Sequence, residues 1–293
     1  MLFTIVITLL AYGCPNQAIV EAYGLDPRTV RRWYHKAGGH SQLVHEQRVL
    51  QEKWDLLHVQ ADEIKVRVQG GVMWMTFAIM VSSRLWLGGA VDGFRSKTMI
   101  VDCLKQVALC ALCRPLLLAV DGLNMYQTAL KKAFRSKHPV GKGGHMKFVE
   151  WGNVILTQVV KKRRGKKCGD IEHVVTIGTE QEAHLLRERS QGGRMINSAF
   201  IERFNATVRQ RLACLHRRSR ATARRKQTLV SGMYLMGCVY NFCSYHHSLS
   251  ERLYLPHGLC RWIKRTPAMA ADLTDHRWTL EELLKFKIGR ATA

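Results

Sequence analysis

Among the acidic residues of this 293-residue chain, Glu202 has the surroundings that most suggest chemistry. It lies in 198-SAFIERFNATVRQRL-212, where it is the single acid among three arginines. Apolar residues at helical spacing predict a helix here, and Glu202, Asn205 and Arg209 follow the edge of its apolar stripe. A half-buried acid needs a partner, either an arginine, which would be structural, or a metal ion, which would be chemical.

Two aspartates elsewhere in the chain are candidate companions for this glutamate. Asp121 follows the apolar run 115-PLLLAV-120, and Asp62 lies within the alternating segment 57-LHVQADEIKVRVQ-69. Ligands bind at the carboxyl ends of strands in α/β sheets, although Asp121 could equally cap the next helix and Asp62 could face solvent. Glu63 follows Asp62 and points to the opposite face of an alternating strand, so we assign the role to Asp62.

Three carboxylates that converge without a counter-charge favour a divalent cation. Mg²⁺ prefers oxygen ligands, and Mn²⁺ can replace it. Two such ions, about 3.5–4 Å apart, activate an attacking oxygen and stabilise the leaving oxygen of a phosphodiester. The sequence therefore predicts that Asp62, Asp121 and Glu202 are metal-binding catalytic residues, with nearby Lys and Arg side chains on the DNA backbone.

The charge balance also indicates a polyanionic partner. The chain has 45 Lys and Arg against 22 Asp and Glu, a net charge of +23. Nucleic acid is the simplest partner for such a protein, although ribosomal and membrane-surface proteins share this balance. A hydrophobic content of 47% excludes a disordered basic tail and predicts a folded core.

A capped basic helix near the N-terminus is typical of a helix-turn-helix. A short helix from Pro15 to Tyr23 is followed by Gly24, and Asp26 then caps a helix over 27-PRTVRRWYHKA-37 that Gly38-Gly39 should end. In this motif the second helix lies in the major groove of DNA. The alternative is an ordinary amphipathic pair with a solvated basic face. The expected DNA contacts are Arg28, Thr29, Arg31, Arg32 and His35.

The pattern further along the chain predicts the elements that position the acids. Short gaps between the first three apolar segments force antiparallel hairpins, and a crossover helix then leads to the strand that ends before Asp121. The expected fold is therefore an α/β, RNase H-like domain with a mixed sheet. The predicted strands are 57–69, 72–81, 84–91 and 115–120, the helices are 96–113 and 123–135, and the segment 195–248 is largely helical.

An insertion near 140–194 interrupts this domain. Two apolar segments, 153–160 and 171–178, flank 161-KKRRGKKCGD-170 and predict a strand pair with a basic tip. Such charge runs are usually solvated loops, but in a DNA-binding chain they can hold phosphate. The candidate contacts are Lys161, Lys162, Arg163 and Arg164. The expected organisation is a DNA-binding domain over 1–40, a helical linker over 41–56, a catalytic domain over 57–250 and a tail over 251–293.

Cysteine usage and the N-terminus bear on the compartment. The nine cysteines are odd in number and several lie in apolar runs, which indicates reduced core thiols. Cys110 and Cys113 form a lone CxxC with no partner pair at zinc-finger spacing. The opening MLFTIVITLLAYGC has no preceding Lys or Arg, so we do not expect an export signal, and no segment is long enough to span a membrane. We expect a cytoplasmic, nucleoid-associated protein without a membrane partner.

Three strings together resemble the DDE transposases of bacterial insertion sequences, in particular the IS-one-like group. They are 60-QADEIKV-66, 120-VDGLNMYQTAL-130 and 197-NSAFIERFNATVRQRLACLHRRS-219, and 240-YNFCSYHHSL-249 resembles a further element of that group. The resemblance implies that Asp62, Asp121 and Glu202 bind Mg²⁺. It further implies cleavage at element ends, transfer of the 3′-hydroxyl to target DNA, and synapsis by a homo-oligomer. Unlike some relatives, this chain shows no N-terminal zinc finger.

The predicted function is therefore Mg²⁺-dependent DNA transposition, with double-stranded element ends and target DNA as substrates. Besides the residues above, we expect Asn205 and Arg209 to contact DNA. The alternative is a regulator that binds DNA through the helix-turn-helix without catalysis, or a decayed copy of a transposase. A regulator does not need three acids at these positions.

Overall fold

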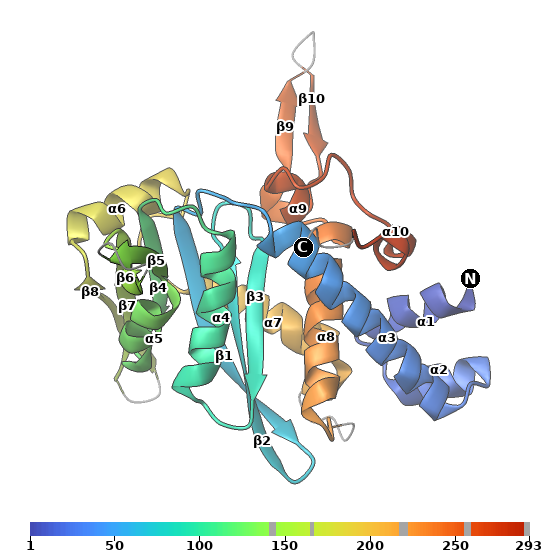
Figure 1. Ribbon diagram of the computed structural model, residues 1–293. Coiled ribbons are helices and arrows are strands. Elements are labelled where there is room, and N and C mark those ends of the chain that lie inside the picture. Colours follow the sequence, from blue (N-terminus) through green and yellow to red (C-terminus); the bar gives the residue numbers. More distant parts are fainter. Residues whose placement is uncertain (141–144, 165–166, 217–221, 255–258, 290–293) are drawn as a thin grey trace.

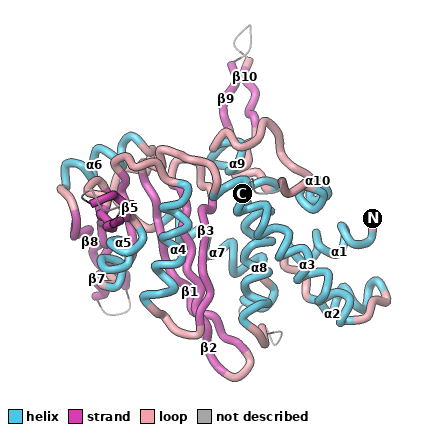
Figure 2. The backbone as a smooth tube through the Cα atoms, in the orientation of Figure 1, coloured by secondary structure: helices cyan, strands magenta, loops and turns pink. Residues whose placement is uncertain are grey.

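The structure is a computed structural model that describes residues 1–140, 145–164, 167–216, 222–254 and 259–289. Helices lie on both sides of a central set of strands (Figure 2). Among the described residues, no helix combines the length and the apolar character that crossing a bilayer requires.

A six-stranded mixed sheet forms the centre of the molecule (Figure 1). Its strands are β1 (His58–Val68), β2 (Gly71–Met80), β3 (Trp86–Asp92), β4 (Leu116–Asp121), β7 (Val154–Arg164) and β8 (Lys167–Ile177), in the order β3-β2-β1-β4-β7-β8. β1 pairs antiparallel with β2 and parallel with β4, and β4 pairs parallel with β7. The predicted α/β class with a mixed sheet is confirmed.

Helices cover both faces of this sheet because alternate strand residues are apolar on each side. The covering helices are α4 (Lys97–Cys110), α5 (Met125–Ala133), α6 (Glu180–Arg189), α7 (Ala199–Arg211) and α8 (Lys226–Cys238). Val59 of β1 packs in the core beneath α4 and α5, whereas Ile64 packs in the core beneath α7 and α8. α6 covers β4 and β7 in a third core that includes Leu117 and Leu186.

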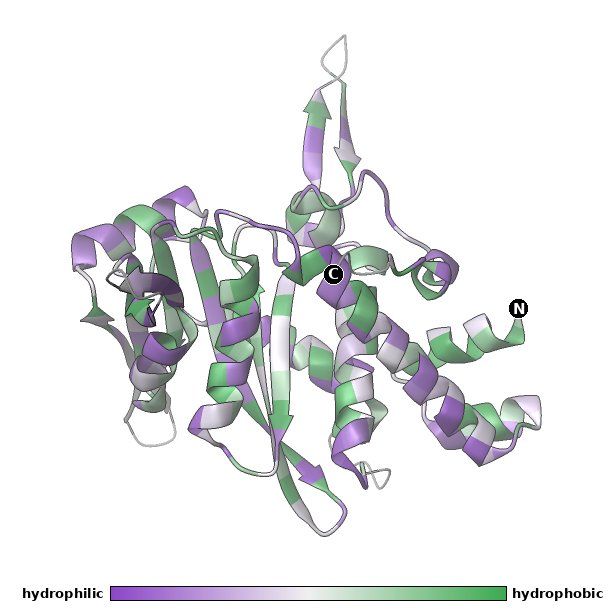
Figure 3. Cartoon of the chain, in the orientation of Figure 1, coloured by the Kyte–Doolittle hydropathy of each residue, from purple (hydrophilic) through white to green (hydrophobic). Residues whose placement is uncertain are grey.

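Three helices precede the sheet and pack on it through α8. They are α1 (Leu2–Ala11), α2 (Asn16–Tyr23) and α3 (Pro27–His45), and a π-helical turn, η1 (Glu46–Leu50), follows. The Asp26 side chain accepts hydrogen bonds from the backbone N–H groups of Arg28 and Thr29 (2.6 and 3.3 Å), which confirms the predicted N-cap. α1 is apolar along its length (Figure 3), and its residues Val6 and Ile7 are fully buried.

The expected end of α3 at Gly38-Gly39 is wrong, because the helix continues to His45 through much of the segment expected as a separate linker. A Cβ on Gly38 would lie 2.5 Å from the Ser231 side chain of α8. The glycine is therefore a point of close approach between two helices. A glycine pair can mark either a helix end or such a contact.

The segment expected as an insertion supplies part of the central sheet. β7 and β8 pair antiparallel, which confirms the predicted strand pair. The basic residues Lys161, Lys162, Arg163 and Arg164 lie in β7, and residues 165–166 are outside the described residues. A separate hairpin joins β5 (Arg135–Val140) to β6 (His145–Glu150).

The C-terminal region combines packed helices with a projecting hairpin. Strands β9 (Glu251–Tyr254) and β10 (Cys260–Ile263) pair antiparallel and extend away from the body of the molecule (Figure 1). Helices α9 (Pro267–Ala270) and α10 (Leu280–Lys285) return to it and bury Ala268 and Leu283. The remaining short elements are the helical turns η2 (Ala213–Leu215), η3 (Val239–Cys243) and η4 (His247–Leu249).

Candidate metal centre

The sheet register brings Asp62 and Asp121 to the same level on neighbouring strands. β1 and β4 pair in parallel with Gln60 opposite Ala119, and each aspartate lies two residues further along its strand. Both side chains therefore lie near the carboxyl end of β4, at the edge where α/β sheets bind ligands.

Gln60 fixes the start of α7 against the same strand. Its side-chain carbonyl accepts a hydrogen bond from the Ile201 N–H (3.0 Å), and its amide donates to the Asn197 carbonyl (2.6 Å). This paired contact holds the first turn of α7, and hence Glu202, beside β1. Glu202 in turn accepts a hydrogen bond from the Ser198 hydroxyl.

The three predicted acids border one pocket of about 390 Å³. Asp62 comes from β1, Asp121 from β4 and Glu202 from α7, so acids 59 and 81 residues apart in sequence meet at one place. The remaining lining residues are Gly122, Val159, Val160 and Ser198.

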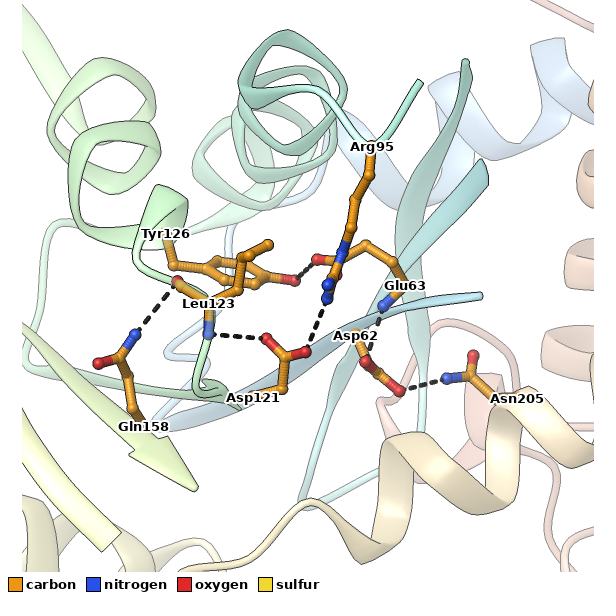
Figure 4. Close-up of polar contacts among 8 residues, drawn as sticks. All are labelled: Asp62, Glu63, Arg95, Asp121, Leu123, Tyr126, Gln158 and Asn205. Carbon is orange, nitrogen blue, oxygen red and sulfur yellow. Dashed lines mark hydrogen bonds and ion pairs between the residues drawn. The ribbon is translucent and has the colours of Figure 1, made fainter. Parts of the chain in front are cut away.

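The carboxyl of Asp62 is strongly perturbed by its surroundings. One of its oxygens accepts from the Glu63 N–H and the other from the Asn205 amide, each at 2.8 Å (Figure 4). Burial raises the pKa of Asp62 to about 7, and the nearby carboxylates of Glu63, Asp121 and Glu202 contribute to that rise. The ionised form is therefore costly unless a cation is present.

Glu63 lies on the other side of the strand, as alternation requires, and belongs to a buried ion-pair network that the sequence did not reveal. Its carboxylate accepts hydrogen bonds from Arg95 (2.6 Å) and from the Tyr126 hydroxyl (Figure 4). The Arg95 guanidinium also donates to Asp121 at 2.8 Å and lies 5.2 Å from the Trp74 ring. Arg95 stands in a loop before α4, where no periodic pattern marks it.

Asp121 is more accessible to solvent than Glu63, the other acid that Arg95 binds. Its side chain is 38% exposed, and its second oxygen accepts from the Leu123 N–H at 3.2 Å. The Gln158 amide donates to the Leu123 carbonyl (3.1 Å), so β7 holds the loop that follows Asp121 (Figure 4).

The donor set suits a hard cation. Carboxylate oxygens of Asp62, Glu63 and Asp121 all lie within 4.8 Å of one another. Glu202 is exposed and borders the same pocket, but it is not part of this group. Arg95 donates to both Glu63 and Asp121, and Tyr126 donates to Glu63. Oxygen-only ligation at an open pocket fits Mg²⁺ or Mn²⁺ and does not fit the thiolate and imidazole sets typical of structural zinc.

The structure separates the predicted DNA contacts into two groups. Arg28, Arg31, Arg32 and Arg209 are exposed and Thr29 is half-buried. In contrast, Asn205 is only 2% exposed and donates to Asp62, and His35 is half-buried with its Nδ1 2.9 Å from the Ser231 hydroxyl. We therefore reassign Asn205 to positioning Asp62, and His35 to the contact between α3 and α8.

No family model matches the chain, and no curated protein matches it.

Proposed function

We propose that this protein is a DDE-type DNA transposase that hydrolyses phosphodiester bonds at the ends of its element and transfers the strand to target DNA. The observation that carries the proposal is the convergence of Asp62, Asp121 and Glu202 on one pocket. Acids from three separate elements meet there on a protein of net charge +23, which is the combination that metal-dependent DNA chemistry needs.

The order of the elements agrees with an RNase H-like fold. An antiparallel set β3-β2-β1 is followed by a parallel β4, with the first aspartate on β1 and the second at the end of β4. The helix α7 then supplies the glutamate. We infer the RNase H-like identity from this agreement and from the resemblance of the three strings around the acids.

Divalent metal at this pocket would supply an activated oxygen nucleophile and charge stabilisation for the leaving oxygen. The chain's own residues would hold and orient it. Asp62 is fixed by Asn205 and by the Glu63 N–H, while Asp121 is fixed by Arg95 and the Leu123 N–H. The raised pKa of Asp62 means that metal binding competes with a proton near neutral pH.

Helices α2 and α3 are the proposed reader of element ends. Asp26 caps α3, and Arg28, Arg31 and Arg32 are exposed near its first turns, where a recognition helix would contact base edges and phosphates. The basic residues of β7 and the exposed Arg209 of α7 are the proposed contacts to the DNA backbone nearer the acid pocket. Two or more copies are expected to assemble around paired ends.

The deciding experiment is cleavage and strand transfer on a labelled end of the parent element, with and without Mg²⁺. Wild type and Asp121→Asn are compared, and DNA binding is measured in parallel. Mg²⁺-dependent products that disappear in Asp121→Asn while binding persists support the transposase. Binding without products in both proteins supports the alternative, a non-catalytic DNA-binding regulator or a decayed copy.

A further inference from the structure

A second cavity lies between the N-terminal helices and the segment that joins α7 to α8. It has a volume of about 350 Å³ and shares no residue with the acid pocket. Its walls come from the end of α1 and the start of α2, from α3, from residues 213–214 and from residues 222–228. This volume is within the range of pockets that hold small organic ligands.

Close contacts beside this cavity hold the N-terminal helices against α7 and α8. Gly13 has φ of +87°, and a Cβ there would lie 2.6 Å from the Gln210 carbonyl at the end of α7. Tyr34 lies against Gly232 of α8, where a Cβ would be 2.2 Å from the tyrosine hydroxyl. Two glycines therefore allow the N-terminal helices to dock closely on α7 and α8, and the cavity is part of that packing.

Positive charge is concentrated around the cavity. Arg31, Arg224 and Arg225 line it together with His35. Burial lowers the pKa of His35, and Arg31 and Arg225 lower it further, as expected where cations gather. Among the described residues, no ion pair joins any of these three arginines to a carboxylate.

The sequence segments that form the walls of the cavity are also poor in acidic residues. Residues 1–20, 27–45 and 203–250 contain no Asp or Glu, and the two acids between the first two ranges are Glu21, which accepts from Gln17, and Asp26, which caps α3. No carboxylate from these segments can therefore neutralise the arginines, and an anion from outside the chain is the natural partner.

Two helix N-termini add to the positive electrostatic potential of the cavity. Pro15 and Asn16 at the start of α2, and Arg225 and Thr228 at the start of α8, all line the cavity. Neither helix has a side-chain cap or an acid in its first turn. Uncapped helix N-termini favour anions, and phosphate above all.

Part of the cavity wall is apolar, and binding of inorganic phosphate alone would not require an apolar surface. Leu10 and Ala223 are buried, and Tyr34 adds an aromatic ring. An apolar floor with a cationic rim matches a ligand with a flat organic part and a phosphate. We propose that this arginine cavity binds a single nucleotide, with its base against the floor and its phosphate between Arg31, Arg224 and Arg225.

The nucleotide has two possible sources, a free nucleotide or one unstacked from a DNA strand. The inference that the nucleotide belongs to DNA rests on the proposed function. The inference that the cavity binds a nucleotide rests only on the residues that line it. α7 leads from the acid pocket to this cavity, since Ala213 lies eleven residues after Glu202. At about 1.5 Å per residue this is roughly 16 Å, or about five nucleotide steps of about 3.4 Å in duplex DNA.

The test measures binding of dAMP by calorimetry without Mg²⁺. Arg224→Ala/Arg225→Ala should weaken binding roughly tenfold to a hundredfold, because it removes two charge-assisted contacts. Thr228→Phe, which fills the cavity and keeps its charge, should also abolish binding. The matched control is Lys131→Ala/Lys132→Ala, an exposed adjacent pair on α5 that removes the same charge far from the cavity in sequence.

Competition with a short single-stranded oligodeoxynucleotide distinguishes the sources. Displacement of dAMP by the oligonucleotide assigns the cavity to a nucleotide of a DNA strand, and dAMP binding that the oligonucleotide leaves unchanged assigns it to a free nucleotide. The proposal is overturned if wild type does not bind dAMP, if inorganic phosphate binds as tightly, or if the lysine control weakens binding equally. Asp121→Asn should bind dAMP normally, so loss of its cleavage activity reports on the acid pocket alone.

Discussion

Replacement of Asp62 by asparagine should stabilise the metal-free protein while removing its function. The pKa of this carboxyl is raised from 3.8 to about 7, mainly by burial and then by neighbouring carboxylates. A folded-state pKa above the unfolded value means that stability is complete at low pH and is lost as pH rises toward 7. The side-chain amide of the Asp62→Asn variant is neutral at every pH and does not incur this cost.

The magnitude follows from the size of the shift. About three pKa units at about 1.36 kcal/mol each set an upper value of about 4 kcal/mol above pH 7. The Asp62→Asn variant can keep both polar contacts, because the buried Oδ1 of Asn205 has no hydrogen-bond partner among the described residues and can accept after an amide flip. Allowing for relaxation and partial solvent access, we expect a gain of about 2 kcal/mol at about pH 8.

Thermal unfolding with a chelator measures this gain. For a chain of this length, about 2 kcal/mol corresponds to a rise in Tm of about 3 °C. The rise should be present at about pH 8 and nearly absent at about pH 4, where the folded carboxyl of wild type is already protonated and only a small part of its cost remains. Mg²⁺ should raise the Tm of wild type at about pH 8 and leave the variant nearly unchanged.

Asp272→Asn is the matched control. Asp272 has a side chain that is 97% exposed and a φ of +55°, a conformation that asparagine also accepts. The Tm of this control should follow wild type at every pH. An Asp62→Asn variant that is no more stable than wild type at about pH 8, or equally stabilised at about pH 4, would refute the view that the ionised Asp62 carboxylate is costly in the metal-free protein.

Three further substitutions test the supports of the site and the fold. Arg95→Ala should destabilise the protein by about 2–3 kcal/mol near pH 8, because Glu63 is left buried without its cation, and denaturant unfolding should show this loss shrinking in acid as Glu63 takes up a proton. Gly38→Ala should cost about 1–3 kcal/mol because α3 cannot approach α8 as closely, whereas Gly39→Ala, with open space around it, should stabilise α3 by about 0.5–1 kcal/mol; equal effects on Tm would contradict this packing. Asn205→Ala should shift the acid limb of the cleavage pH profile to higher pH, because it removes a donor from the ionised catalytic aspartate, and an unchanged profile would argue against that positioning role.

The elements around the acids could be predicted because their patterns are local. The strand over Asp62 alternates, the strand before Asp121 is a bounded apolar run, and α7 has a clear apolar stripe. The antiparallel pairing of the first three strands follows from these patterns and from the short connections between them.

What could not be predicted depends on contacts between distant residues. The bridge that Arg95 makes between Glu63 and Asp121 joins three elements, and nothing in the neighbourhood of Arg95 indicates it. Asn205 was expected on DNA because its place at the edge of a helical stripe does not show whether the facing strand covers it. The path of α3 beyond Gly38 was missed for the same reason, since the glycine's partner lies on α8.

The central claim, that Asp62, Asp121 and Glu202 hold a divalent cation together, is tested most directly by Mn²⁺ binding in a paramagnetic resonance titration. Asp62→Asn, Asp121→Asn and Glu202→Gln are compared with Glu188→Gln, which changes an exposed glutamate on α6. The account predicts that each of the first three weakens Mn²⁺ binding at least about tenfold and that Glu188→Gln does not. Binding that survives in Glu202→Gln and Asp121→Asn at wild-type strength would contradict it.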